Sequence, residues 1–95
     1  MAGYAGAGYE IEHRWKEEVV YWEGRRGVLF DAGWGVEPPV VYVPSSSIWP
    51  DVMPDWCRER RDEVVARLRE HSDHEVREDV HGYYRNDPGS RLLRR

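Results

Sequence analysis

Residues 9–30 read YEIEHRWKEEVVYWEGRRGVLF and contain the pattern that decides the fold. Apolar or aromatic side chains alternate with charged ones over residues 9–16, which is the period of two of a half-buried β-strand. The same parity continues further along the chain, so we expect one long strand over residues 9–22. Residues 24–27, Gly-Arg-Arg-Gly, separate this strand from the apolar residues 28–30, a spacing typical of a β-hairpin.

Downstream of the hairpin, the sequence predicts two more strands and one main helix. Residues 40–43 form a β-branched run after two prolines, which is typical of a short strand near a sheet edge. Residues 52–71 carry an apolar stripe with helical spacing, interrupted by two arginines in its middle. Alternation returns over residues 74–80 and indicates a final edge strand. Residues 87–93 suit a short helical turn, with Asp as its cap and Pro at its first position.

These elements predict an α+β fold in two layers. We expect a mainly antiparallel sheet of about four strands, with one main helix over about residues 52–71 packed on one face. Residues 9–84 form a single domain in this interpretation. It lies between a flexible, Gly- and Ala-rich N-terminal segment (residues 1–8) and a basic C-terminal tail (residues 85–95).

The composition excludes several protein classes. Hydrophobic residues make up 40% and charged residues 34% of the chain, which fits a globular protein rather than a disordered or membrane one. No apolar run approaches the ~20 residues of a membrane helix, and residues 1–8 lack the basic and apolar regions of a secretory signal. Cys57 is the only cysteine, so no internal disulfide is possible. We therefore expect a cytoplasmic protein.

Charge is distributed unevenly along this chain, whose formal net charge is −4. Residues 1–23 carry five acidic and two basic side chains, and residues 72–83 carry four and one, so each segment has a local charge of −3. Residues 84–95 carry four arginines and one aspartate, which gives +3. These opposite signs favour either docking of the tail on acidic side chains of its own or a neighbouring chain, or binding of a charged partner.

Five tryptophans supply more aromatic surface than so small a core needs. Trp15, Trp22 and Trp56 lie in predicted strands or at a helix flank and are interpreted as packing residues. The other two lie on Gly- and Pro-bounded loops, where aromatic side chains are common binding anchors; a lid over the core is the alternative for each. The predicted binding residues are the aromatic anchors Trp34, Trp49, Tyr83 and Tyr84 and the tail residues Arg85, Arg91, Arg94 and Arg95.

Patterns for catalysis and metal binding are weak. His71, Asp73, His74 and His81 cluster near the join between the predicted helix and the last strand, but this spacing is weak evidence for zinc, and solvated polar side chains are the preferred interpretation. Cys57 lies on the apolar stripe, which favours a small buried residue over a nucleophile. We expect no metal and no cofactor.

The function most consistent with these features is non-enzymatic binding of a protein, as in an interaction or inhibitor/immunity-type module, with self-association as one form of it. An alternative is a small enzyme or ligand-binding domain whose pocket contains Trp34, Trp49 and polar neighbours such as Asp31 or His13. A second alternative is nucleic-acid binding through the Arg and Tyr residues of the tail, which the overall negative charge opposes.

Overall fold

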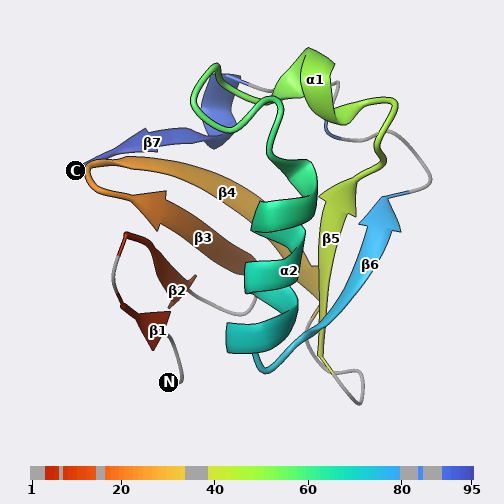
Figure 1. Cartoon of the computed structure of the whole chain (residues 1–95). Helices are drawn as coiled ribbons and strands as arrows, with labels where there is room; N and C mark the ends of the chain where they lie inside the picture. The colour runs from red at the N-terminus through yellow and green to blue at the C-terminus, as the bar shows by residue number, and fades with distance from the viewer. Residues whose placement is uncertain (1–3, 7, 15–16, 34–38, 80–83, 85–88) are drawn as a thin grey trace.

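The computed structural model describes residues 4–6, 8–14, 17–33, 39–79, 84 and 89–95 (Figure 1). Among these residues are seven strands, two α-helices and one short 3-10 helix. In chain order they are β1 (Tyr4–Ala5), β2 (Glu10–Arg14), β3 (Glu18–Glu23), β4 (Arg26–Gly33), β5 (Val40–Pro44), α1 (Trp49–Val52), α2 (Arg61–His71), β6 (Glu75–Asp79), η2 (Gly89–Arg91) and β7 (Leu92–Arg94).

The strands form one mixed sheet in the order β1-β2-β3-β4-β5-β6, and β7 pairs with β4. All pairs are antiparallel except β5 with β6, which are parallel. The prediction of a mainly antiparallel sheet of about four strands was therefore wrong in strand number, because the sheet has seven strands and is mixed. Two of the additional strands are β1 and β7, and the third arises because the first predicted strand is divided into β2 and β3.

This division is the hairpin of β2 and β3, which replaces the long strand predicted over residues 9–22. Ile11 lies opposite Tyr21 and His13 opposite Val19, so odd-numbered residues pair with odd-numbered ones. Because of this pairing, side chains of the same parity point to the same sheet face before and after the reversal. The alternation passes through the turn without a break in phase, and it therefore gave no sign of the reversal.

The predicted hairpin around Gly24–Gly27 is confirmed. Glu23 pairs with Arg26, which leaves a two-residue loop of Gly24 and Arg25. Gly24 has a φ of +63°, a left-handed conformation that suits glycine in such a loop.

The predicted helix over residues 52–71 is interrupted, and α1 and α2 are separated by the turns of residues 53–60. In a continuous helix the carbonyl of Cys57 would accept the N–H four residues later. Here this carbonyl accepts the backbone N–H of Arg60 at 3.0 Å and the indole N–H of Trp49 at 3.1 Å. The side chain of Arg60 binds β3 instead of continuing a helical face, so tertiary contacts override the helical pattern.

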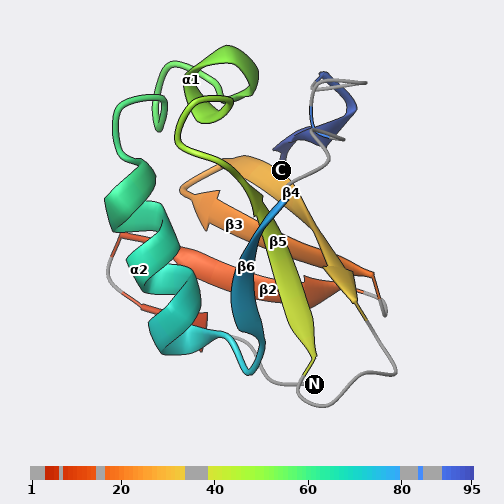
Figure 2. The same ribbon diagram turned by 90° about the vertical axis from the view of Figure 1, so that its right-hand side faces the viewer.

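The core lies between the sheet and the helices. Figure 2 shows α2 across one face of the sheet, where β5, α2 and β6 form a β-α-β unit. Burial of a large apolar side chain contributes roughly 1.5–3 kcal/mol, so these contacts hold the helix on the sheet. The largest fully buried members of the cluster are Trp49, Tyr21, Tyr84, Phe30, Ile11 and Leu68.

The C-terminal segment joins the sheet rather than forming only the helical turn predicted over residues 87–93. Gly89–Arg91 is a single 3-10 turn, and Leu92–Arg94 is the strand β7, which pairs with the first residues of β4. Ion pairs join Arg91 to Asp31 and Arg95 to Glu10. Docking of the tail on acidic side chains of its own chain, one of the outcomes expected from its charge, is what the structure shows for these two arginines.

Candidate partner-binding surface

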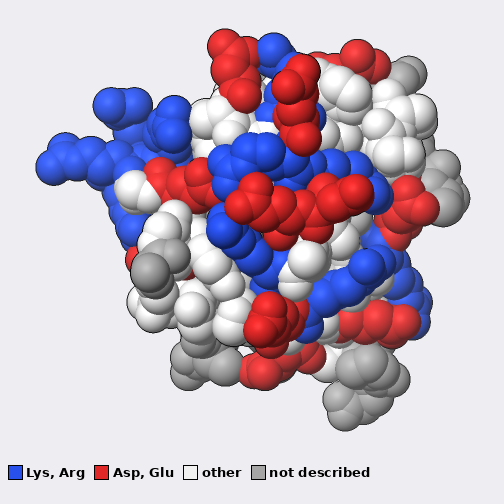
Figure 3. Space-filling view, in the orientation of Figure 1, with Lys and Arg blue, Asp and Glu red and all other residues white. Residues whose placement is uncertain are grey.

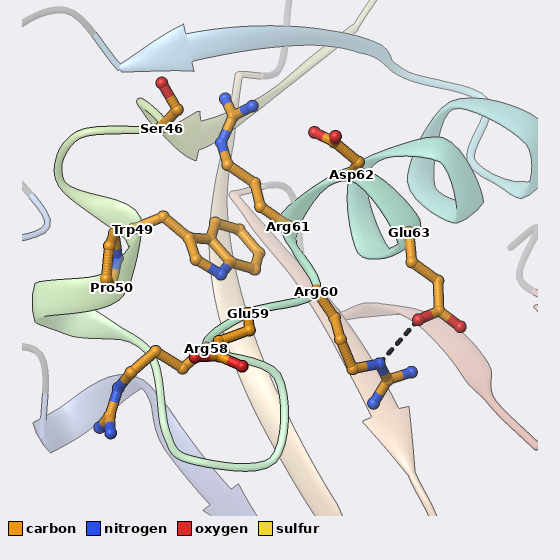
Figure 4. Close-up of a pocket in the computed structure, with 9 residues that line it drawn as sticks. All are labelled: Ser46, Trp49, Pro50, Arg58, Glu59, Arg60, Arg61, Asp62 and Glu63. Atoms are coloured by element: carbon orange, nitrogen blue, oxygen red, sulfur yellow. Dashed lines mark hydrogen bonds and ion pairs between the residues drawn. The ribbon is translucent and has the colours of Figure 1, made fainter.

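A groove of about 410 Å³ opens between the start of α1 and the first turn of α2 (Figure 4). A second hollow of about 280 Å³ shares Arg58, Glu59 and Arg60 with its lining. The residues that line the groove are Ser46, Trp49, Pro50, Arg58, Glu59, Arg60, Arg61, Asp62 and Glu63.

The arginines of this groove are bound to other parts of the protein. Arg60 forms a bidentate pair with Glu23, with N–O distances of 2.9 and 2.7 Å. Arg61 donates from Nε to the carbonyl of Pro44 at 3.1 Å, and Arg58 pairs at 2.6 Å with a carboxylate of its own loop. The guanidiniums of Arg60 and Arg61 fasten the inter-helix segment and the start of α2 to β3 and β5, whereas Arg58 is paired within its own loop.

Glu23 lies at the centre of a network of hydrogen bonds and ion pairs between the sheet and α2. The hydroxyl of Tyr21 donates to Glu23 at 2.5 Å and accepts from Arg67 at 2.7 Å, and Arg67 also pairs with Glu63 at 2.8 Å. Burial alone would raise the pKa of the Glu23 carboxyl, but the hydrogen bonds from Arg60 and Tyr21 and the nearby positive charges hold that pKa below its usual value. Burial, followed by the bond to Glu23, raises the pKa of Tyr21. This network joins α2 to the sheet.

Cys57 is only 1% exposed. Burial, with a smaller effect of the negative charge of Glu23, raises the pKa of its thiol to about 12. The thiolate is the nucleophilic form of cysteine, and this thiol stays protonated at neutral pH. The interpretation of Cys57 as a small buried residue is confirmed.

The histidines that the sequence placed together lie in two separate contacts. His71 stacks on Tyr4 at 3.7 Å, whereas His74 packs edge-to-face against His13 at 4.9 Å. Burial lowers the pKa of both His13 and His74, because desolvation disfavours the charged imidazolium. His81 lies outside the described residues. Within the described ranges, no group of three or more His, Cys, Asp or Glu side chains is arranged to hold a metal ion.

Two of the predicted aromatic anchors are core residues. Trp49 and Tyr84 are each 1% exposed, and both pack against Phe30, at centroid distances of 6.1 and 6.3 Å. The indole of Trp49 folds back over the core, as in the alternative interpretation, and its N–H donates to the carbonyl of Cys57. The structure therefore replaces the predicted binding role of these two side chains with a packing role. Three other predicted residues lie outside the described part of the chain: Trp34, Tyr83 and Arg85.

Tyr84 and Arg91 close a gap beside β4. The hydroxyl of Tyr84 donates to the carbonyl of Tyr42 on β5 at 2.5 Å and accepts the backbone N–H of Asp31 on β4 at 2.8 Å. Arg91 binds the Asp31 carboxylate in bidentate fashion at 2.8 and 2.9 Å and lies 4.1 Å above the Tyr84 ring. Arg91, predicted as a partner-binding residue, is thus bound within the domain.

Four arginines from two distant parts of the sequence meet where β3 and β7 end and β4 begins, and we call this set the basic corner: Arg25, Arg26, Arg94 and Arg95. All four are exposed, and the space-filling view shows basic side chains gathered at this edge (Figure 3). Arg26 lies directly opposite Arg94 in the β4–β7 register, and the backbone N–H of Arg95 donates to the carbonyl of Arg25 at 2.9 Å. Two of the predicted tail residues, Arg94 and Arg95, therefore belong to a larger basic surface.

The arginines of the basic corner differ in how many contacts they make. Arg95 pairs with Glu10 at 2.9 Å and covers the Trp22 ring at 4.5 Å, and Arg26 lies 5.1 Å from the centre of a Trp56 ring. Within the described part of the chain, the side chains of Arg25 and Arg94 have no ion pair or hydrogen bond. Their donors are available to a partner.

An apolar side chain adjoins the basic corner. Leu92 lies opposite Val28, on the same sheet face as Arg26 and Arg94, since strand residues two apart share a face. It is 45% exposed and is the one exposed large hydrophobic side chain among the residues the structure describes. Exposed apolar area bordered by arginine is typical of protein interfaces.

Sequence analysis missed Arg25, Arg26 and Leu92 as surface candidates. A signal for the first two was present, because adjacent arginines between glycines at a hairpin turn are exposed by their position. Leu92 had no such signal in the sequence, because its exposure depends on the strand β7, and the sequence pattern indicated a helical turn there instead.

No protein-family model, curated protein or solved structure matches this chain. None of the described helices is long and apolar enough to cross a membrane. The function is therefore inferred from the charges and contacts of the surface residues.

Proposed function

We propose that this chain is a small non-enzymatic protein-binding domain that binds an acidic segment of a partner protein at the basic corner. The observation that carries the proposal is the placement of Arg26 directly opposite Arg94, with both side chains exposed. Like charges in directly opposed cross-strand positions destabilise a sheet. Carboxylates of a partner remove this repulsion and receive charge-assisted hydrogen bonds from the guanidiniums.

Apolar and aromatic neighbours favour a protein partner over nucleic acid. Leu92 is exposed, and Trp56 is half-buried beside Arg26, so the surface combines apolar area with arginine, as interface hot spots do. Stacking of unpaired bases requires an open aromatic face, whereas Trp22 is 3% exposed and Arg95 covers it. The net charge of −4 also opposes a densely charged phosphate backbone more than a short acidic segment. Small acidic interaction or inhibitor/immunity-type modules fit this description.

Several observations support a non-enzymatic function. The thiol of Cys57 is buried and protonated, and the arginines of the groove are already paired within the protein. The alternative pocket predicted from sequence needs Trp49 beside Asp31 or His13, but the groove that Trp49 lines contains neither of them.

The test is titration of the chain with a fluorescent, capped hexaglutamate peptide at low salt, followed by anisotropy. In the double variant Arg25→Gln/Arg94→Gln, each substitution removes an exposed contact worth about 0.5–1 kcal/mol. We therefore expect binding weaker by about 5- to 30-fold. The matched control is Arg14→Gln/Arg69→Gln, which changes the net charge equally away from the corner and removes side chains without an ion pair to a described residue.

Added salt is expected to weaken binding of the wild-type chain, because exposed charges are screened. Equal losses in the two double variants would mean that net charge, not the basic corner, determines binding, and the proposal would then be abandoned. A twelve-nucleotide oligothymidylate that binds more tightly than the peptide would assign the corner to nucleic acid instead.

A further inference from the structure

A hollow of about 290 Å³ adjoins the basic corner on the side of β1 and β2. It is open to solvent, so a side chain of a bound segment can enter it. Gly8 and Gly24 both have positive φ values, +93° and +63°, and no atom lies within 4 Å of where their side chains would begin. The hollow is therefore open at both turns. Its lining residues are Ala5, Gly6, Gly8, Tyr9, Glu10, Gly24 and Arg95.

Arg95 is positioned before any partner binds. Its Nε donates to the carbonyl of Gly24 at 3.1 Å, and its planar group lies 4.5 Å from the centre of the Trp22 ring. The Trp22 indole is in turn fixed by a bond to Glu12 at 2.9 Å. A guanidinium held in this way loses little further freedom when a carboxylate binds.

Glu10 occupies Arg95 through a single contact, from Nη2 to one carboxylate oxygen at 2.9 Å. Arginine has five N–H donors and pairs best with a carboxylate through two parallel bonds, so this contact is incomplete. The Arg95 and Glu10 side chains are 44% and 35% exposed. Ion pairs exposed to this extent change an equilibrium by at most about fivefold, so another carboxylate displaces Glu10 at little cost.

We propose that Glu10 is an internal competitor for the partner, and that a carboxylate side chain of the acidic segment enters the hollow and replaces Glu10 at Arg95. This inference rests on the proposed function, and it adds a specificity-determining residue that the basic corner alone does not define. Glu10 then lowers the affinity of any anion that binds Arg95 by at most about fivefold, and a carboxylate that forms two parallel bonds with Arg95 from the hollow overcomes this competition most readily.

The experiment measures hexaglutamate binding by four variants: Glu10→Gln, Glu18→Gln, Arg95→Gln and the double variant Glu10→Gln/Arg95→Gln. Glu18 is the control, because it lies at the opposite end of the β2–β3 hairpin and its substitution changes the net charge equally. We expect Glu10→Gln to bind about two- to fivefold more tightly than Glu18→Gln. In the Arg95→Gln background the gain from Glu10→Gln is expected to vanish, because the group for which Glu10 competes is absent.

Nuclear magnetic resonance localises the effect in the same samples. The Nε–H resonance of Arg95 and the amide resonances of Gly8 and Gly24 are expected to shift on addition of peptide to the wild-type chain. Equal affinity of Glu10→Gln and Glu18→Gln, or a gain that persists without Arg95, overturns the internal-competitor inference but leaves the proposed function standing. Failure of the wild-type chain to bind, or insensitivity to Arg25→Gln/Arg94→Gln, overturns both.

Discussion

Gly27→Ala tests whether the close approach of Trp22 to β4 stabilises the sheet. Gly27 lies directly opposite Trp22 in the β3–β4 register. A β-carbon added at Gly27 would lie 2.6 Å from Cε3 of the Trp22 ring and 2.8 Å from Cζ3, well inside van der Waals contact. The indole has little room to move away, because Glu12 accepts its N–H at 2.9 Å and Arg95 lies above it at 4.5 Å.

Two opposing effects determine the magnitude. Overpacking at a well-filled site typically costs about 1–3 kcal/mol, and replacing glycine with alanine typically stabilises by about 0.4–1 kcal/mol through the unfolded state. We expect a net loss of about 1–2 kcal/mol in the free energy of unfolding. For a domain of this size, each kcal/mol shifts Tm by about 4–8 °C, so Tm is expected to fall by about 5–15 °C.

Urea and thermal unfolding followed by far-ultraviolet circular dichroism measure this change without relying on tryptophan fluorescence. The same substitution in a Trp22→Leu background is the control, because the smaller side chain leaves room for the methyl group. There we expect Gly27→Ala to be neutral or stabilising. A wild-type-background variant as stable as the parent, or an equal loss in both backgrounds, would refute the steric explanation.

Three further predictions concern the interior contacts. Glu23→Gln removes the carboxylate that binds Arg60 and Arg67 and joins α2 to the sheet. We expect urea unfolding to show a loss of about 2–3 kcal/mol in the free energy of unfolding. Glu70→Gln is the control, because Glu70 is exposed, and we expect it to be near neutral. Tyr84→Phe leaves a β4 N–H and a β5 carbonyl unpaired and is expected to lower the free energy of unfolding by about 1–3 kcal/mol. Burial lowers the pKa of His13 and of His74, so near and below about pH 6.5 the unfolded chain binds more protons than the folded chain, and the free energy of unfolding falls as the pH drops from that value towards the folded-state pKa values. Replacing both histidines with Gln is expected to flatten this part of the curve of stability against pH. An unchanged slope would contradict the assignment.

The strands show how far periodicity predicts this fold. Alternation over residues 9–22 correctly indicated strand structure but could not show the reversal between β2 and β3, because equal parity is kept across the turn. The hairpin at Gly24–Gly27 was predictable, because a short glycine-bounded loop is a local signal. The pairing of β7 with β4 joins residues far apart in sequence, and no local pattern in Leu92–Arg94 distinguishes a strand from a helical turn.

The helix shows how tertiary contacts change a local pattern. The apolar stripe over residues 52–71 is real, since Val64, Leu68 and Cys57 are all buried. Its interruption depends on Arg60 reaching Glu23 on another strand and on the carbonyl of Cys57 accepting the Trp49 indole. Both contacts join separate elements, so their free energies lie outside any sum of helix propensities.

The sequence by itself determined the α+β class, the local signs of charge and the hairpin at Gly24–Gly27, because these depend on near neighbours. Only the tertiary structure decided that Trp49 and Tyr84 are core residues and that Arg94 lies opposite Arg26. Burial depends on which surfaces the folded chain brings together. The basic corner exists because backbone pairing of β4 with β7 overcomes the repulsion between the arginines that it joins.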